Sequence, residues 1–476
     1  RKWRMRGSTP RKPWMNASTP TAHPASFRDP AGFIFTRDGC LYRQVNARYR
    51  EQYDRLMGSG LYRALAEDGL LIPHEEVNPG LVAAAGAYRV LRPRAIPFIS
   101  YPYEWCFSQW QDAALLTLRV QQRALEYGMT LKDCSAFNVQ FLDGKPIFID
   151  TLSFERAVEG APWAAYRQFC EHFLAPLALM AHCDIRLARL FRTQVNGMPL
   201  AMAARLLPWR TRCSPGLLVH LHLHARFQRR ASARALPASR GRMPLRVLQG
   251  LVCSLEAAVR GLRWTARDAG WGGYYDEMPS YAPDAFAAKR ALVGELLDLA
   301  KPSAVWDIGA NTGVFSRLAS DRGIPTLALD FDYAAVERNY RRARDHGETH
   351  LLPLVQDVMN PSPGVGWMMA ERDSLFARGP ADLVMALALL HHLVVANNVP
   401  LPRVAAFFAA LGRQLLIEYV PTDDAQVQQL LRLRDESYAG YTREDFEGAF
   451  AKHYAIIASR PIPGAGRILY LMRAAR

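Results

Sequence analysis

The C-terminal half of the chain alternates short apolar runs with segments of helical periodicity. The run at 303–308 breaks into glycines, and apolar positions at helical spacing follow through Phe315 and Leu318. Short apolar runs bounded by turn residues predict buried strands. Strand–helix repeats with short connections are typical of a doubly wound, mainly parallel sheet, and we expect the last two runs to add an antiparallel hairpin. The seven predicted strands cover 303–308, 325–330, 351–355, 381–388, 415–419, 454–458 and 467–472.

The N-terminal half has a different pattern. Residues 33–45 alternate around Asp38-Gly39, which predicts a hairpin. Helical spacing follows from Tyr49 to Leu65, and 108–127 forms a second helical pattern that ends before Gly128. Residues 87–102 are irregularly apolar and contain three prolines, so we expect edge strands and a connection there. This half is therefore predicted to be an α+β domain.

The net charge of +15 is concentrated in two segments. Residues 1–28 contain seven Lys or Arg and no acid, whereas 186–264 contain fifteen Arg and the single acid Glu256. The basic tail 1–26 lacks hydrophobic periodicity and is predicted to be disordered, with an organellar targeting segment as the alternative. The Arg-rich segment allows three interpretations: a surface for nucleic acid, a surface that docks on an anionic membrane, or amphipathic connecting helices.

Three closely spaced histidines, His220, His222 and His224, could imitate a metal cluster, but no cysteine or carboxylate is nearby and we favour core or surface histidines. No apolar run reaches the roughly 18 residues of a membrane span, so no transmembrane segment is predicted. The seven cysteines are scattered and odd in number, which favours a reducing compartment and a cytoplasmic location.

The changes of pattern along the chain predict four parts. They are a disordered basic tail (1–26), an α+β domain (27–185), an Arg-rich helical segment (186–265) and the doubly wound domain (266–476).

Three polar residues of the α+β domain stand in an ordered arrangement. Asp133 is followed five residues later by Asn138, then by a predicted hairpin and Asp150. Over about 30–185, this arrangement resembles the catalytic loop and metal-binding aspartate of protein kinases and aminoglycoside phosphotransferases. The resemblance implies that Asp133 orients or deprotonates a hydroxyl, and that Asn138 and Asp150 hold Mg²⁺ with ATP.

The same domain departs from the kinase pattern. No lysine occurs between Lys12 and Lys132, so the strand lysine that pairs with phosphate is missing. There is also no Gly-x-Gly-x-x-Gly loop, although Arg43 or Arg48 could stand in for the lysine. Two interpretations remain: a kinase-like scaffold without phosphate transfer, which we favour, or an active kinase-like domain that uses Mg-ATP.

Acids follow three successive strands of the doubly wound domain. Asp307, Asp330 and Asp357 each come at a strand end, and the first opens the loop Asp307-x-Gly309-x-Asn311-x-Gly313. Carboxylates would repel a phosphate-bearing cofactor. They suit S-adenosylmethionine, which carries a sulfonium, an amino group, ribose hydroxyls and an adenine amine. An NAD-linked Rossmann enzyme is the structural competitor, but its Gly-x-Gly-x-x-Gly is absent.

Over about 270–476, the chain resembles class I S-adenosylmethionine-dependent methyltransferases. The resemblance implies a Rossmann-like seven-stranded sheet in which Asp307 and the loop at Gly309, Asn311 and Gly313 contact the methionine part of the cofactor. Asp330 would bind the ribose hydroxyls and Asp357 the adenine amine. The runs at 360–367, 387–393 and 417–424 are also similar to a bacterial group that includes nodulation-related methyltransferase-like proteins.

Candidate catalytic groups follow the next two strands. His391 and His392 come after the fourth strand and Glu418 ends the fifth, where a base could face the transferable methyl group. For the histidines, loop packing or capping is the alternative. The predicted function is methyl transfer from S-adenosylmethionine to an unidentified acceptor: a small molecule, a sugar, a lipid or RNA. The alternatives are a bifunctional methyltransferase and kinase, and a non-catalytic binding protein.

Overall fold

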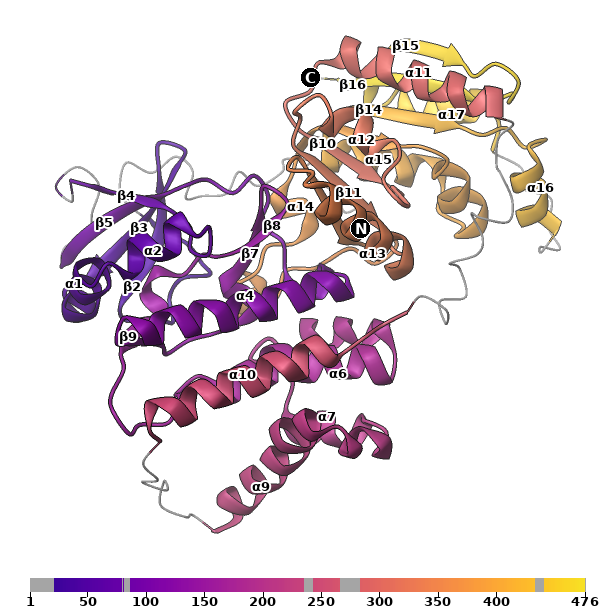
Figure 1. The fold of residues 1–476 in the computed structure, drawn as a ribbon. Coiled ribbons are helices and arrows are strands. Elements are labelled where there is room, and N and C mark those ends of the chain that lie inside the picture. Colours follow the sequence, from indigo (N-terminus) through magenta and orange to yellow (C-terminus); the bar gives the residue numbers. More distant parts are fainter. Residues whose placement is uncertain are drawn as a thin grey trace, which may run out of the picture.

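The C-terminal half is built on a seven-stranded sheet in the order β12-β11-β10-β13-β14-β16-β15 (Figure 1). The computed structural model describes residues 21–78, 80, 86–234, 243–265, 283–432 and 441–475. The first five strands in this order are parallel, and β16 runs antiparallel between β14 and β15. This confirms the predicted doubly wound sheet with a final hairpin. The strands are β10 (Val305–Ile308), β11 (Thr326–Asp330), β12 (Leu351–Val355), β13 (Ala381–Ala386), β14 (Gly412–Tyr419), β15 (Tyr454–Pro461) and β16 (Ile468–Ala474).

Helices cover both faces of this sheet. Leu383 and Leu416 pack with one set of helices (α11 and α12), whereas their neighbours Val384 and Leu415 face the other set (α13, α15 and α17). Between β10 and β13 the strand order reverses, and ligands of such sheets bind beyond the carboxyl ends of the strands at this point. The helices are α11 (Pro283–Ala300), α12 (Ser316–Ser320), α13 (Tyr333–His346), α14 (Leu375–Arg378), α15 (Leu401–Leu411), α16 (Ala425–Arg432) and α17 (Arg443–Phe450).

The N-terminal half begins with a five-stranded antiparallel sheet in the order β1-β2-β3-β5-β4. The predicted hairpin is confirmed, with Asp38 and Gly39 in left-handed conformations at its turn. Two helices, α1 and α2, connect β3 to β4. The elements are β1 (Thr21–Ala22), β2 (Gly32–Arg37), β3 (Cys40–Asn46), α1 (Arg50–Gly58), α2 (Leu61–Glu67), β4 (His74–Val77) and β5 (Ala87–Pro93).

Two local expectations are wrong in this sheet. The strand predicted at an edge, β5, lies between β3 and β4. Its prolines do not interrupt the ladder, because Pro93 is the last strand residue and Pro97 and Pro102 lie beyond it. Thr21 and Ala22 pair with β2, so the predicted disorder of 1–26 does not hold for them. Residues 1–20 of that tail lie outside the described residues.

A mainly helical part follows. The predicted helix at 108–127 is present as α4 (Phe107–Glu126), and Gly128 has φ 68° just past its end. Helix α10 of the Arg-rich segment lies along α4 (Figure 1). The small sheet, the connecting helices, α4 and the loop after it give the expected kinase-like architecture. The further elements are β6 (Met129–Leu131), β7 (Val139–Leu142), β8 (Lys145–Phe148), β9 (Phe154–Arg156), α5 (Tyr166–Phe169), α6 (Ala175–His182), η7 (Ile185–Arg192), α7 (Leu200–Leu206), η8 (Trp209–Cys213), α8 (Pro215–Leu217), η9 (Leu218–Leu223), α9 (His224–Arg234) and α10 (Leu245–Gly261).

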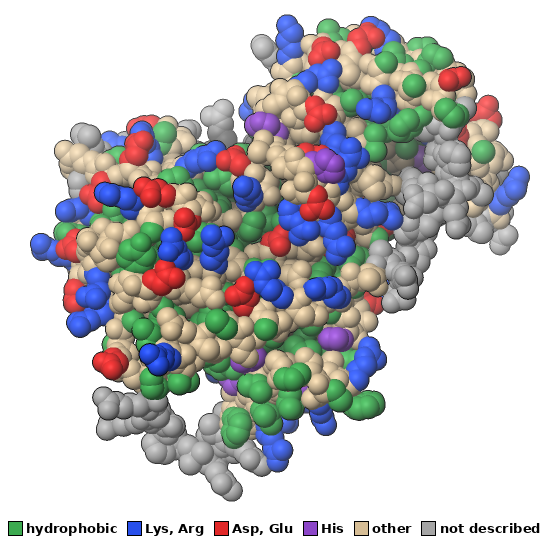
Figure 2. All heavy atoms as spheres, viewed as in Figure 1, with side chains coloured by type: hydrophobic (Ala, Val, Ile, Leu, Met, Phe, Trp, Pro, Cys, Tyr) green, Lys and Arg blue, Asp and Glu red, His purple; other side chains and the backbone are tan. Residues whose placement is uncertain are grey.

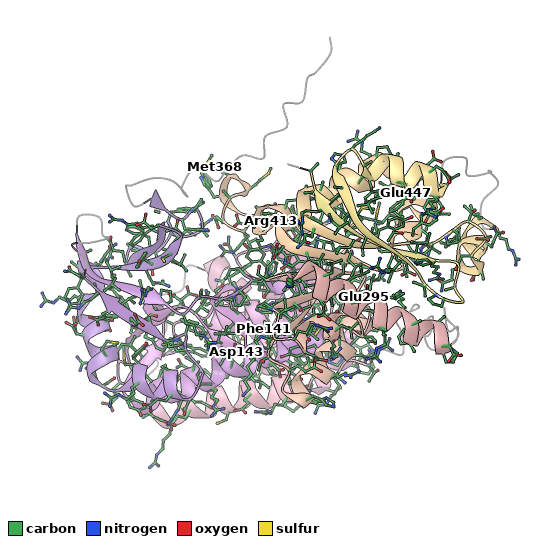
Figure 3. The ribbon with its side chains drawn as sticks, turned by 90° about the horizontal axis from the view of Figure 1, so that it is seen from above. Phe141, Asp143, Glu295, Met368, Arg413 and Glu447 are labelled. Atoms are coloured by element: carbon green, nitrogen blue, oxygen red, sulfur yellow. The ribbon has the colours of Figure 1, made fainter. Side chains whose placement is uncertain are left out.

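The two halves share a large polar and apolar contact. The N-terminus of α4 meets α13, where Ser108 N donates to Glu337 Oε2 over 2.9 Å. Phe141, from the β7–β8 hairpin and labelled in Figure 3, packs edge-on against Tyr340 of α13 at 5.8 Å. A buried ion pair joins Arg378 to Glu104.

Within the described ranges, no helix combines the length and apolarity that a membrane span requires.

Candidate cofactor and active site

Asp307 lies at the carboxyl end of β10 with its side chain buried. Its Oδ2 accepts a 2.6 Å hydrogen bond from Ser316 Oγ of α12. Burial raises the pKa of Asp307 to about 7; the Ser316 hydrogen bond and the ammonium of Lys289 oppose this shift, and the carboxylate of Asp330 adds to it. Because burial disfavours the ionised form of Asp307, a cation bound beside it would stabilise the carboxylate.

The loop after β10 alternates left-handed residues. Gly309, Asn311 and Gly313 have φ values of 76°, 48° and 76°. Asn is among the few non-glycine residues that tolerate this region, which explains why it can replace a glycine here. A Cβ on Gly313 would lie 2.5 Å from the side chain of Asn339, so this glycine permits close packing of the loop on α13.

Asp330 ties this loop to the next one. Its Oδ2 accepts from Asn311 N at 2.7 Å and its Oδ1 accepts from Asp332 N at 2.9 Å. Burial raises the pKa of Asp330 to about 6, although these backbone hydrogen bonds lower it. Asp357 follows β12, is half-buried, and accepts from Met359 N at 2.9 Å. The structure thus places all three predicted acids at the carboxyl ends of neighbouring strands.

Glu418 lies at the end of β14 in a buried ionic cluster. Its Oε2 accepts from Lys289 Nζ at 2.6 Å and from Ala388 N at 2.8 Å, and its Oε1 lies 3.5 Å from Arg467 Nη1. The Lys289, Glu418 and Arg467 side chains are 2%, 0% and 2% exposed. Arg467 also donates to Asp424 Oδ2 at 2.7 Å.

The sequence reasoning missed Lys289 and Arg467. For Lys289 a signal existed: it stands four residues after Ala285 and four before Val293, both buried positions of α11. A charged residue in the apolar stripe of a helix requires a buried partner, and Glu418 is that partner. No comparable periodic signal marks Arg467, which lies between β15 and β16.

His391 and His392 follow β13 with their ring centroids 4.2 Å apart. His391 is fully buried, and among the described residues neither of its ring nitrogens has a hydrogen-bond partner. Burial holds the pKa of His391 well below 6.5, and His392, Arg467 and Lys289 lower it further. Burial also lowers the pKa of His392. Both imidazoles are therefore neutral at pH 7, and burial makes each a weaker base than a free imidazole.

The kinase-like residues also come together. Asp133 Oδ1 accepts from Gln168 Nε2 at 2.7 Å, and burial together with the nearby Asp150 carboxylate raises the pKa of Asp133. Asn138 Nδ2 donates to Ser153 Oγ at 3.3 Å.

Arg43 reaches this cluster from β3 and forms an ion pair with Asp150. Arg48, the other candidate to replace the missing lysine, is exposed. Arg43 is therefore paired with Asp150, the acid that the resemblance to protein kinases implies as a metal ligand.

Comparison with known proteins assigns the chain to a family. No family model matches it. The curated nodulation protein NoeA of Rhizobium meliloti (strain 1021) is 33% identical over 456 residues, which cover 94% of each chain. The chain belongs to the NoeA family of nodulation proteins.

Solved structures similar to this NoeA-family chain are more distant. The bifunctional kinase-methyltransferase WbdD is 14% identical, with a TM-score of 0.30 over 42% of each chain, so the match spans less than half of WbdD. The magnesium protoporphyrin IX methyltransferase ChlM of Synechocystis PCC 6803, solved with bound SAM, is 16% identical over 44% of this chain and 93% of its own, with a TM-score of 0.31. The strand order and the kinase-like arrangement described above carry the assignment of the fold.

Arg189 and Arg192 of the Arg-rich segment of this NoeA-family chain are half-buried against aromatic rings, whereas the first arginine, Arg186, is exposed and paired with Asp184. On η7, a 3₁₀ helix in which residues three apart eclipse, the Arg189 guanidinium lies 5.8 Å from the centroid of the Tyr333 ring on α13. That of Arg192 lies 5.6 Å from the centroid of the Tyr103 ring. Arg189 thus contacts the C-terminal half, and Arg192 reaches it by a 3.4 Å hydrogen bond from Nη2 to Ser362 Oγ.

The three histidines of the segment serve packing. His220 hydrogen-bonds to the Tyr166 hydroxyl and to Ser254 Oγ, both at 2.9 Å, and His222 to Thr211 Oγ1 at 2.8 Å. The described residues contain no cluster of His, Cys, Asp and Glu that could hold a metal ion.

Proposed function

We propose that this protein transfers a methyl group from S-adenosylmethionine to a nucleophilic acceptor. One observation carries the proposal: three carboxylates, Asp307, Asp330 and Asp357, stand at the ends of β10, β11 and β12 around the loop at 309–313. Such a donor set fits a cofactor with a cationic methionine part, ribose hydroxyls and an adenine amine. In this proposal, Asp307 and the loop bind the methionine part, Asp330 the ribose and Asp357 the adenine.

Isothermal titration calorimetry tests the cofactor. We expect one equivalent of S-adenosylmethionine or S-adenosylhomocysteine to bind, and no heat with NAD. Transfer of a labelled methyl group to a panel of hydroxylated small molecules, sugars, lipids and RNA then tests turnover. Binding without transfer to any acceptor class would favour a non-catalytic binding protein, and absence of binding would overturn the proposal.

Cofactor binding should depend on pH. Burial raises the pKa of Asp307 from its ordinary value of 3.8 to about 7. The contribution of Asp307 to folding stability is therefore fully present below pH 3.8 and is lost as the pH rises through about 7. Asp330 follows the same sign, with loss through about 6. A cationic cofactor favours the ionised carboxylates, so affinity should increase between pH 6 and 7 by up to roughly tenfold per unit. Calorimetry in buffers of different ionisation enthalpy should detect proton release; a pH-independent affinity without proton release would contradict the assignment.

We propose that His392 accepts a proton from the acceptor and that Lys289 and Arg467 hold Glu418 as a positioning group. A carboxylate already bound by an ammonium and a guanidinium is a poor proton acceptor, whereas a neutral imidazole keeps one ring nitrogen that can take up a proton. His391, with two unpartnered ring nitrogens among the described residues, is the second candidate base.

Replacing His392 by alanine should lower turnover by roughly a hundredfold or more and leave cofactor affinity nearly unchanged. The matched variant His391→Ala shows which of the two rings matters. Steady-state kinetics and calorimetry on the same samples make the comparison. An unchanged rate for His392→Ala would remove this residue from the mechanism.

We propose that the kinase-like part is a scaffold without phosphate transfer. The ion pair between Arg43 and Asp150 supports this, because it occupies the carboxylate that would hold Mg²⁺. Titration with Mg-ATP should give no binding heat, and no phosphorylated product should form. The alternative, a bifunctional enzyme, would be established by phosphate transfer that disappears in Asp133→Asn.

A further inference from the structure

Four large apolar side chains protrude from the Arg-rich helical segment. They are exposed by 76% (Trp209), 62% (Phe227), 49% (Val219) and 48% (Leu206). Their elements, α7, η8, η9 and α9, contact one another. Large apolar side chains exposed on helices that contact one another are typical of a surface that meets a protein or a membrane. We call these four residues the apolar patch.

Basic side chains surround the apolar patch. The sole acid of 186–264, Glu256, is ion-paired with Arg260, so no other carboxylate of this segment balances its arginines. Figure 2 shows hydrophobic and basic side chains gathered at the lower end of the molecule, over α7 and α9. Among the side chains that the structure describes, the exposed arginines of these elements are Arg205, Arg210, Arg212, Arg226 and Arg229.

The apolar patch rests on an ordered base. Buried Leu217, Leu221 and Ala225 anchor its helices in the core. A Cβ on Gly216 would lie 2.6 Å from Ala258 Cβ, so α8 and α10 are in close contact. The helices that carry the apolar patch are therefore packed against the core, and its side chains are exposed on a folded surface.

We propose that the apolar patch and its arginines dock the protein on an anionic lipid bilayer. Aromatic and aliphatic side chains enter the interfacial region of a membrane, and neighbouring arginines pair with lipid phosphates. Nucleic acid is a poorer match, because the aliphatic Val219 and Leu206 offer no surface on which a base can stack. The helices α7 and α9 that carry two side chains of the apolar patch lie at one end of the molecule (Figure 1).

Co-sedimentation with vesicles tests this docking. We expect the full chain to bind vesicles of phosphatidylcholine and phosphatidylglycerol, and to bind pure phosphatidylcholine at least about tenfold more weakly. The double variant Trp209→Ser with Phe227→Ser should lose at least about tenfold in affinity for the anionic vesicles. Arg205→Gln with Arg212→Gln should also weaken binding to anionic vesicles and reduce its salt dependence.

A matched control removes exposed apolar side chains from the other half. Trp367 and Met368 are 66% and 83% exposed; Met368 is labelled in Figure 3. Trp367→Ser with Met368→Ser should bind vesicles as the unaltered chain does. All variants change exposed residues, so unfolding curves should coincide.

Four outcomes would overturn the proposal. They are no binding to anionic vesicles, equal binding by the Trp209/Phe227 variant, an equal loss in the Trp367/Met368 control, and a patch that serves another partner. The last would appear as binding of bulk RNA, or as a dimer in analytical ultracentrifugation, that the Trp209/Phe227 variant abolishes while vesicle binding persists. None of these measurements depends on methyl transfer.

Discussion

Replacing Asp330 by alanine should weaken S-adenosylmethionine binding by roughly a hundredfold. A hydrogen bond to a charged group contributes about 1.5–3 kcal/mol, and a loss of about 2.7 kcal/mol is a hundredfold in affinity. The change removes the carboxylate proposed to bind the ribose. It also leaves Asn311 N and Asp332 N without their acceptor, so the loop that shapes the methionine side loses its anchor.

Two further variants separate these effects. Asp330→Asn retains one acceptor oxygen but loses the charge and the second acceptor, so an intermediate affinity is expected. Asp321→Ala changes an exposed aspartate at the end of α12 and should bind the cofactor normally. Calorimetry gives the affinities and thermal unfolding monitors the fold. If Asp330→Ala binds the cofactor as tightly as the unaltered protein, the ribose assignment is wrong.

Replacing Arg378 by methionine should lower the free energy of unfolding by about 3–5 kcal/mol. The guanidinium of Arg378 donates to Glu104 Oε1 at 2.5 Å and Oε2 at 2.8 Å, with side-chain exposures of 5% and 1%. It also lies over the Phe98 and Tyr101 rings, at 4.7 and 4.8 Å from their centroids. Methionine would retain much of the packing, but Glu104 would be a buried carboxylate without its cation.

A surface pair offers the control for this change. Arg460 and Glu295, the latter labelled in Figure 3, are 3.0 Å apart with exposures of 40% and 52%. Arg460→Met should alter the free energy of unfolding by less than about 1 kcal/mol. Denaturant titration compares the two variants. Adding Glu104→Gln to Arg378→Met should recover part of the loss, and equal effects of the Arg378 and Arg460 changes would contradict the prediction.

The features predictable from the sequence were those with a local signal. Apolar runs gave the strands of the doubly wound sheet, and Asp307, Asp330 and Asp357 were found because each directly follows a strand. Prolines near β5 misled the prediction, since what matters is whether a proline removes an N–H from the ladder, and these do not.

Pairs that join distant segments were beyond such reasoning. Lys289 and Glu418 are 129 residues apart, and Arg378 and Glu104 are 274 apart. Except for Lys289, whose place in the apolar stripe of α11 marks it as buried, each member of these pairs resembles a surface charge until the fold brings its partner close. The same is true of Arg43, for which the sequence left Arg48 as an equal alternative.

The N-terminus of α4 serves both halves of the molecule. Ser108 bonds to Glu337, and Gln109 Nε2 donates to Pro353 O at 2.9 Å, so α4 supports α13 and β12 while forming the centre of the kinase-like part. Selection for the proposed cofactor site therefore also constrains the residues of the kinase-like part that pack against α4. That part of the chain can be retained over evolution as the foundation of its neighbour, whether or not it performs chemistry of its own.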